Sequence, residues 1–106
     1  MSEWVWTWCG SSFGWIDDDA LYTHDGRHVG YVERDDEDIL VFAICDGRYI
    51  GEIRSSDRLV TKESRMGRSR PPRRQRRTLM ARMRRMGRMG RMIPIGCRDF
   101  PQPEQL

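Results

Sequence analysis

The chain has 106 residues, of which 38% are hydrophobic and 33% charged, and its formal net charge is +3. This length allows one domain, or a small domain with a tail, and no window approaches the roughly eighteen apolar residues of a membrane span. The first residues lack the pattern of a secretory signal, and three cysteines form no disulfide framework. A reduced, cytoplasmic setting is therefore expected.

The charge is divided unequally along the chain. Residues 1–64 carry fourteen acidic and six basic side chains, a net charge of −8, whereas residues 65–106 carry thirteen Arg and two acidic residues, a net charge of +11. We therefore expect a folded domain over residues 1–64 and a basic, partly disordered extension over residues 65–106.

The first element is a strand over residues 4–8, where aromatic and smaller side chains alternate strictly. Alternation places Trp4, Trp6 and Trp8 on one face of that strand. Two interpretations of this face stay open. It is either a wall of the core or an exposed stripe on which nucleic-acid bases stack.

Short apolar segments separated by turn signals follow, over residues 13–16, 21–23, 28–33, 39–45, 49–54 and 59–61. Together with the first strand they make seven strands, a spacing typical of an antiparallel all-β meander. Residues 39–45 form the longest apolar run, which predicts a central strand buried on both faces. Residues 17–19 are three consecutive Asp, and we expect a solvated turn there because a calcium loop spaces its ligands.

A hexapeptide occurs twice, at Asp25–Gly30 and Asp46–Gly51, with a degenerate copy at residues 9–14. Asp-Gly predicts a hairpin, because a type I′ turn needs positive φ at both central positions, and similarity at fixed offsets indicates a repeat architecture. The two full copies supply the expected structural turn residues: Asp25, Gly26, Gly30, Asp46, Gly47 and Gly51.

These hairpins predict an all-β fold, a small closed antiparallel meander of pseudo-fourfold petals with an Arg/Met-rich C-terminal extension. Closure is expected because it removes the two exposed edges of a meander. Residues 59–61 would open a fourth petal that residues 1–64 do not complete. We expect a segment of the extension near residues 78–93, beginning with the apolar residues 78–80, to complete it.

The recurrence of Asp-Gly-Arg-x-[Val/Ile]-Gly at Asp25–Gly30 and Asp46–Gly51, together with the aromatic opening strand, resembles the bacterial 4-fold beta flower proteins. The acidic, Pro-containing end at residues 99–104 is also similar to relatives of comparable length. The resemblance covers roughly the first sixty residues, and it departs from the family pattern at residues 9–12. It implies four hairpin petals around a pseudo-fourfold axis and no catalytic activity.

The extension holds thirteen Arg and no acidic residue between Arg65 and Arg98. Arg-rich arms are typical of proteins that contact phosphate backbones, and Arg forms bidentate phosphate contacts. The candidate nucleic-acid-binding residues lie around its densest part: Arg68, Arg70, Arg73, Arg74, Arg76 and Arg77.

Methionine recurs at every third residue of the extension, at positions 80, 83, 86, 89 and 92. A period of three does not match the 3.6 residues of an α-helical turn, and Gly87 and Gly90 weaken a helix further. We expect no amphipathic helix. Low-complexity expansion explains the pattern, and so does adaptable packing of Met against a partner.

The sequence favours a non-catalytic binding protein that contacts RNA or another polyanion through its Arg-rich tail. The alternative is an assembly module whose basic tail docks on the acidic β domain, in cis or by self-association in an oligomer; a passive tail also stays open. Nucleophile elbows and phosphate-cradling Gly loops are absent from the sequence, and His24 and His28 supply too few ligands for zinc. We therefore expect no enzyme, cofactor, metal, small-molecule substrate or membrane partner.

Overall fold

The computed structural model of the chain describes residues 3–35, 37–55, 57–71 and 73–106. Its strands are β1 (Glu3–Thr7), β2 (Ser12–Asp17), β3 (Ala20–Thr23), β4 (His28–Asp35), β5 (Asp38–Ala43), β6 (Tyr49–Arg54), β7 (Arg58–Lys62) and β8 (Cys97–Asp99). Two short 3₁₀ helices complete the list, η1 (Glu63–Arg65) and η2 (Pro103–Gln105). The described residues contain no α-helix, and the seven strands predicted within residues 1–64 are all present as β1–β7.

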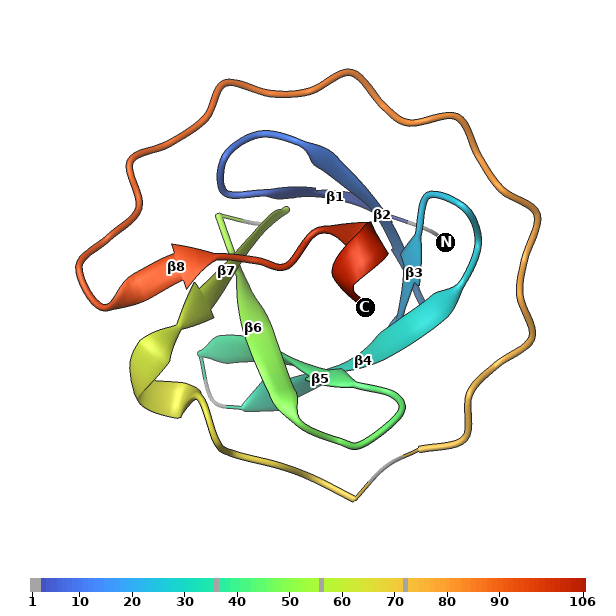
Figure 1. Cartoon of the computed structure of the whole chain (residues 1–106), viewed down its shortest axis with the longest axis horizontal. Helices are drawn as coiled ribbons and strands as arrows, with labels where there is room; N and C mark the ends of the chain where they lie inside the picture. The colour runs from blue at the N-terminus through green and yellow to red at the C-terminus, as the bar shows by residue number, and fades with distance from the viewer. Residues whose placement is uncertain (1–2, 36, 56, 72) are drawn as a thin grey trace.

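The sheet closes on itself. Each strand pairs antiparallel with the next along the chain, and β1 and β7 close the ring in parallel, with Trp6 opposite Arg58 and Thr7 opposite Leu59. The predicted all-β closed meander is therefore confirmed. The β1–β2, β3–β4 and β5–β6 hairpins point outward around a common axis (Figure 1), and β7 with β8 occupies the fourth direction.

The fourth hairpin is completed by a different segment from the one predicted. β8, at Cys97–Asp99, pairs antiparallel with β7, whereas residues 78–93 form no strand. The physical reason is that Phe100, directly after β8, is only 2% exposed and packs in the core. This buried ring holds the pairing in place, and residues 78–80 offer no comparable anchor.

The interior of the barrel is mainly aliphatic. Its members are Val5, Phe13, Leu21, Val29, Val32, Val41, Ala43, Ile50, Ile53, Leu59 and Phe100. On β5, Val41 belongs to this cluster while Leu40 and Phe42 belong to a second cluster on the opposite face. The expected burial of this strand on both faces is therefore confirmed.

A β-bulge explains the apolar residue that precedes the second Gly of each repeat. The register shifts once in each of the three outward hairpins, so that Phe13, Val29 and Ile50 are each passed over in the pairing. All three side chains join the interior cluster. A bulge adds one residue to a strand and re-aims side chains, and here it sends one apolar group per petal into the core.

The second Gly of each full repeat lies inside a strand rather than in a turn. Gly30 belongs to β4 and Gly51 to β6. A Cβ on Gly51 would lie 2.4 Å from the Phe100 ring, and one on Gly30 would lie 2.8 Å from the carbonyl oxygen of Phe42. These positions exclude a side chain because of close packing, which corrects their assignment as turn residues.

The first Gly of each full repeat does occupy a turn of positive φ. Gly26 has φ +88° and Gly47 has φ +73°. Neither Asp25 nor Asp46 is among the positive-φ residues of the described chain, so these turns are not the type I′ turns predicted. Two consecutive positive φ values occur instead at Asp18 and Asp19, 50° and 61°, in the exposed turn between β2 and β3.

Candidate nucleic-acid interface

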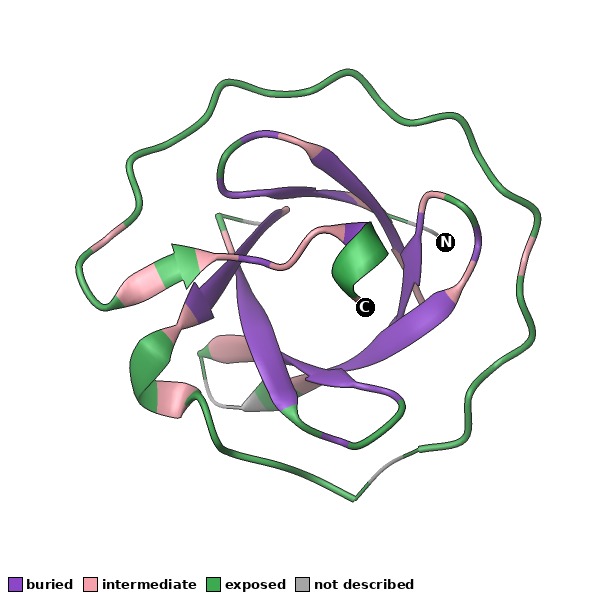
Figure 2. Cartoon of the chain, in the orientation of Figure 1, coloured by how far each residue is buried: buried purple, intermediate pink, exposed green. Residues whose placement is uncertain are grey.

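The extension encircles the barrel instead of leaving it. Residues 66–96, which we call the strap, run around the outside of the hairpins before β8 returns to β7 (Figure 1). Nearly all of the strap is exposed (Figure 2). Its two ends are held by the core: Phe100 follows it, and Arg65 precedes it.

Arg65 anchors the start of the strap through a buried carboxylate. Glu52 is 1% exposed, and its carboxylate lies 2.9 Å from Arg65 and 2.7 Å from Arg54. Arg65 also pairs with Asp38, and this hydrogen bond lowers the pKa of Asp38. The Tyr49 hydroxyl donates to Glu52, and burial raises the pKa of Tyr49 to about 12. The network therefore keeps a neutral phenol beside a charged pair at neutral pH.

One strap amide docks on the turn Gly of each repeat. The carbonyl of Gly47 accepts from the Arg70 amide, that of Gly26 from the Leu79 amide, and that of Gly10 from the Arg88 amide. Because residues 70, 79 and 88 are nine apart, nine strap residues span one petal. The strap passes the petals in reverse chain order.

The period of three in the strap sequence follows from this docking. Three residues per turn is the period of a polyproline II helix, which has no internal hydrogen bonds, and every third residue from 70 to 91 faces the barrel. Leu79 packs with Trp15 and Tyr22, and the remaining inward residues are arginines. The residues that follow them face outward, and the five methionines among these are 87–92% exposed.

Six of the inward arginines lie over aromatic rings on the outer face of the barrel. The distances from guanidinium carbon to ring centroid range from 3.7 Å to 5.7 Å. The pairs are Arg70 with Phe42, Arg73 with Tyr31, Arg82 with Trp15, Arg85 with Trp4, Arg88 with Trp6, and Arg91 with Trp8. We call these six rings the aromatic girdle.

Of the two interpretations of the tryptophan face, burial is confirmed for Trp6 and Trp8, but on the outer side of the barrel. Trp6 and Trp8 are each 8% exposed, so they form no open stacking stripe. They are not part of the barrel interior either, because Val5 occupies that face of β1. The strap supplies their cover, and its carbonyls accept the indole hydrogens: Trp6 donates to Met86 and Trp8 to Met92.

Ion pairs join the strap to the acidic barrel. Arg70 lies 3.2 Å from Glu33, and Arg76 lies 3.7 Å from Asp18. Arg88 pairs with Asp57. These partners follow the charge division seen in the sequence, but the arginines keep 41–47% of their side-chain surface exposed, so each pair is weak by itself.

The structure separates the six predicted nucleic-acid-binding residues into two groups. Arg68 holds the strap through its backbone carbonyl, which accepts from the Tyr49 amide, and Arg70 and Arg73 lie over rings. The Arg76 amide donates to Nδ1 of His28. Arg74 and Arg77 are exposed, and neither forms an ion pair with a residue that the structure describes.

His28 is therefore one of the barrel residues that hold the strap. Its ring is 3% exposed, and burial together with the Arg76 charge lowers its pKa. Nδ1 accepts a hydrogen bond, so this ring is neutral with its hydrogen on Nε2. Within the described ranges, no three His, Cys, Asp or Glu side chains gather in a way that could hold a metal ion.

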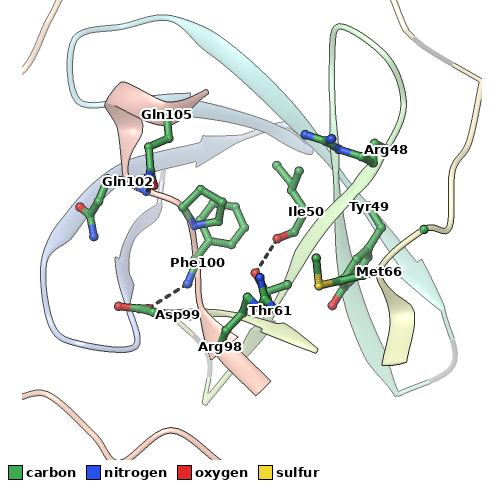
Figure 3. Close-up of a pocket in the computed structure, with 12 residues that line it drawn as sticks. Arg48, Tyr49, Ile50, Thr61, Met66, Arg98, Asp99, Phe100, Gln102 and Gln105 are labelled. Atoms are coloured by element: carbon green, nitrogen blue, oxygen red, sulfur yellow. Dashed lines mark hydrogen bonds between the residues drawn. The ribbon is translucent and has the colours of Figure 1, made fainter. Parts of the chain in front are cut away.

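A cavity of about 550 Å³ lies between β6 and the C-terminal segment. Figure 3 shows Arg48 and Arg98 at its edges and Phe100 at its centre. Thr61 donates to the carbonyl of Ile50, and Asp99 accepts from the Phe100 amide. These two polar side chains are therefore engaged in hydrogen bonds within the fold.

Docking of the tail on the β domain was one of the alternatives that the sequence left open, but its repeating geometry was not predicted, although a signal for it was present. The period of three was compared with an α-helix, but it equals the period of a polyproline II helix. The girdle was also missed, because alternation defines two faces of a strand without saying which one lies inside.

No family model, curated protein or solved structure matches the chain. The resemblance to the 4-fold beta flower proteins therefore stays a prediction from the repeat motifs. None of the helices in the described part of the chain is long and apolar enough to cross a membrane.

Proposed function

We propose that the protein is a non-catalytic binding protein that contacts RNA or another polyanion through the arginines of its strap. The observation that carries this proposal is the stacking of six arginines on the girdle. A guanidinium over a ring uses its flat face, and its N–H donors lie at the edge, where a phosphate oxygen can compete with carboxylates such as those that Arg70 and Arg88 contact. Stacking also restricts the side chain beforehand, which reduces the entropy lost on binding.

Two further strap arginines add positive charge and form no ion pair with a residue that the structure describes. Arg74 and Arg77 are exposed and lie next to the inward arginines 73 and 76. The strap carries no acidic residue, so the charged side chains that an approaching polyanion meets along it are all positive. Long-range attraction of this kind raises association rates and falls with salt.

The experiment is a fluorescence anisotropy titration of a labelled single-stranded RNA with the full chain, across a salt series. Counterion release predicts a slope of about −0.7 in log K against log salt for each neutralised phosphate. The double variant Arg74→Gln/Arg77→Gln is expected to reduce the slope by about 1.4. Arg34→Gln is the matched control, because Arg34 is exposed on β4 outside the strap.

The full chain is required in this experiment. Removing residues 65–106 would also remove Phe100 from the interior, so loss of binding could reflect unfolding. Absence of binding at low salt would contradict the proposal, as would an equal loss of slope in Arg34→Gln.

The second candidate function is an assembly module whose basic strap docks on the acidic β domain, in cis or on a second copy. Its support is the repeated docking of strap amides on Gly10, Gly26 and Gly47. The same contacts made between two copies would give a swapped dimer. Sedimentation velocity over a hundredfold range of concentration tests this, because exchange predicts a mass that doubles, whereas docking in cis predicts a constant monomer.

We also propose a reduced, cytoplasmic setting. It is supported by the cysteines, because Cys9, Cys45 and Cys97 are all unpaired in the structure. Exposed free thiols persist where the surroundings keep them reduced.

A further inference from the structure

A small cavity lies where the strap crosses the turn between β2 and β3. Its volume is about 120 Å³, and Arg73, Arg74, Arg76, His28 and Tyr31 are among its lining residues. Three arginines within four residues of the strap thus meet at this cavity. This is the place where the structure brings together half of the six predicted nucleic-acid-binding arginines.

Two of the three arginines are held in position. The Arg73 guanidinium lies 4.1 Å from the centroid of the Tyr31 ring, and the Tyr31 hydroxyl donates to the carbonyl of Pro71. The Arg76 amide donates to Nδ1 of His28 at 2.8 Å, and its guanidinium donates to the carbonyl of Asp18 at 3.3 Å. Both guanidinium groups are therefore oriented before any ligand arrives.

The charge around the cavity is positive on balance. Arg73, Arg74 and Arg76 face two carboxylates, Asp18 and Asp19, at the rim. Asp18 is 87% exposed and lies 3.7 Å from Arg76, so water screens much of its charge. Arg73 and Arg74 form no ion pair within the described part of the chain, and their charge is left for an anion.

The size of the cavity restricts the ligand. Sites for drug-sized molecules measure about 300–1,000 Å³, so about 120 Å³ admits a single small group and excludes a base with its sugar. A terminal phosphate offers three acceptor oxygens and a charge of about −1.5 to −2. A phosphodiester inside a strand offers two free oxygens and one charge.

We propose that this cavity is a subsite for the terminal phosphate of an RNA strand, held by Arg73, Arg74 and Arg76. The inference rests on the proposed polyanion function and adds a preference for phosphorylated ends. The strap leads away from the cavity toward Arg82, Arg85, Arg88 and Arg91, which lie along the rest of the girdle. A strand whose end occupies the subsite can place its next phosphates along this row.

The test compares two RNA oligomers of one sequence, one with a 5′-phosphate and one with a 5′-hydroxyl, by anisotropy with the full chain. The phosphorylated oligomer is expected to bind about tenfold more tightly. Arg74→Gln is expected to abolish this ratio; it removes no ion pair found in the described structure, so folding is preserved. Arg77→Gln, on the strap outside the cavity, is the matched variant, and it should weaken both oligomers equally and keep the ratio.

The outcomes separate the subsite from the polyanion function. Equal binding of the two oligomers would overturn the subsite and leave polyanion binding intact. A ratio that survives in Arg74→Gln would also overturn it. If neither oligomer binds, both the polyanion function and the assignment to RNA ends are wrong.

A titration with inorganic phosphate tests, without RNA, whether the cavity binds an anion. His28 lines the cavity, so its ring resonances report an anion bound there. A saturable shift that is lost in Arg74→Gln supports the pocket, and no shift overturns it. A phosphoserine peptide that binds as tightly as the phosphorylated oligomer would overturn RNA as the source of the phosphate.

Discussion

The barrel interior and the aromatic girdle are both buried, but their cover differs. The interior is closed by carbon atoms of opposite strands, with Leu59 and Val41 at 0% exposure. The girdle is covered by a charged, extended segment that lays every third side chain on the rings and remains largely exposed itself. Burial in this chain therefore has two origins: closure of the sheet, and the docking of a strap that strand patterns do not reveal.

The largest effect is expected inside the barrel. Phe100→Ala removes a ring that is 2% exposed, contacts Phe13 edge to face, and holds β8 against β7. The expected loss in the free energy of unfolding is about 3–5 kcal/mol, measured by urea denaturation. A loss under about 1 kcal/mol would contradict the placement of the C-terminal segment in the core.

Two glycine substitutions separate the stability that strap contact contributes from the cost of backbone strain. Gly26 and Gly67 both have positive φ, but a Cβ on Gly26 would lie 2.0 Å from the carbonyl oxygen of Leu79, whereas one on Gly67 would meet nothing within 4 Å. Gly67→Ala is expected to cost about 1–2 kcal/mol. Gly26→Ala should cost about 1 kcal/mol more, because it also breaks the strap hydrogen bond. Equal thermal and urea stabilities of the two variants would show that the strap does not press on this turn.

A girdle substitution sharpens the contrast with the interior. Trp6→Ala removes a ring lying under Arg88 and the indole bond to Met86. The void opens to solvent, so the expected cost is the transfer contribution of about 1.5–3 kcal/mol, without the added cavity contribution of a closed core. A cost matching that of Phe100→Ala in urea denaturation would show that the strap seals the girdle as tightly as the sheet seals the interior.

The smallest expected effect is the dependence of stability on pH through His28, which holds the strap. Burial lowers the pKa of His28 below its usual value, so the unfolded state binds more protons in the range between the lowered pKa and about 6.5. The stability that depends on neutral His28 is complete above about pH 6.5 and is lost as pH falls through that range. Protonation also removes the acceptor of the Arg76 amide.

The measurement is the melting temperature between pH 8 and pH 5. His28→Asn should flatten the decline, and His24→Asn is the matched control and should not. The carboxylates with lowered pKa, Asp25 and Asp38, act below about pH 4, outside this range. Parallel declines in both variants would show that His28 does not couple protonation to stability.

The strands were predictable because local signals determine them. Strict alternation at residues 4–8 and the Asp-Gly turns marked β1 and the hairpins, and the apolar run at residues 39–45 indicated a strand covered on both faces. The two roles of glycine in the repeat were harder to separate. Gly26 adopts a positive φ, whereas Gly51 allows the Phe100 ring to approach closely. The role of Gly51 therefore depends on a residue half the chain away.

The strap could not be predicted from local pattern alone. Among its described residues none belongs to a helix or a paired strand. The spacing of its residues matches the spacing of the petals, which exist only after the barrel has closed. The closing strand was misplaced for the same reason, because a three-residue strand such as β8 carries too little signal. The sequence did not show which arginines stack and which face water. This became clear only from the hydrogen bonds that place residues 70, 79 and 88 on the turn glycines.

Hydrogen exchange of the strap amides, resolved by NMR, is the measurement that tests whether the strap is docked on the barrel. The amides of Leu79, Arg82, Arg88 and Arg91 donate to the carbonyls of Gly26, His24, Gly10 and Trp8. The amides of Met80, Met83, Met89 and Met92 have no such partner among the described residues. Slow exchange at the first set and fast exchange at the second, repeating every third residue, is the result that a docked strap predicts. Uniformly fast exchange along residues 73–92 would contradict it.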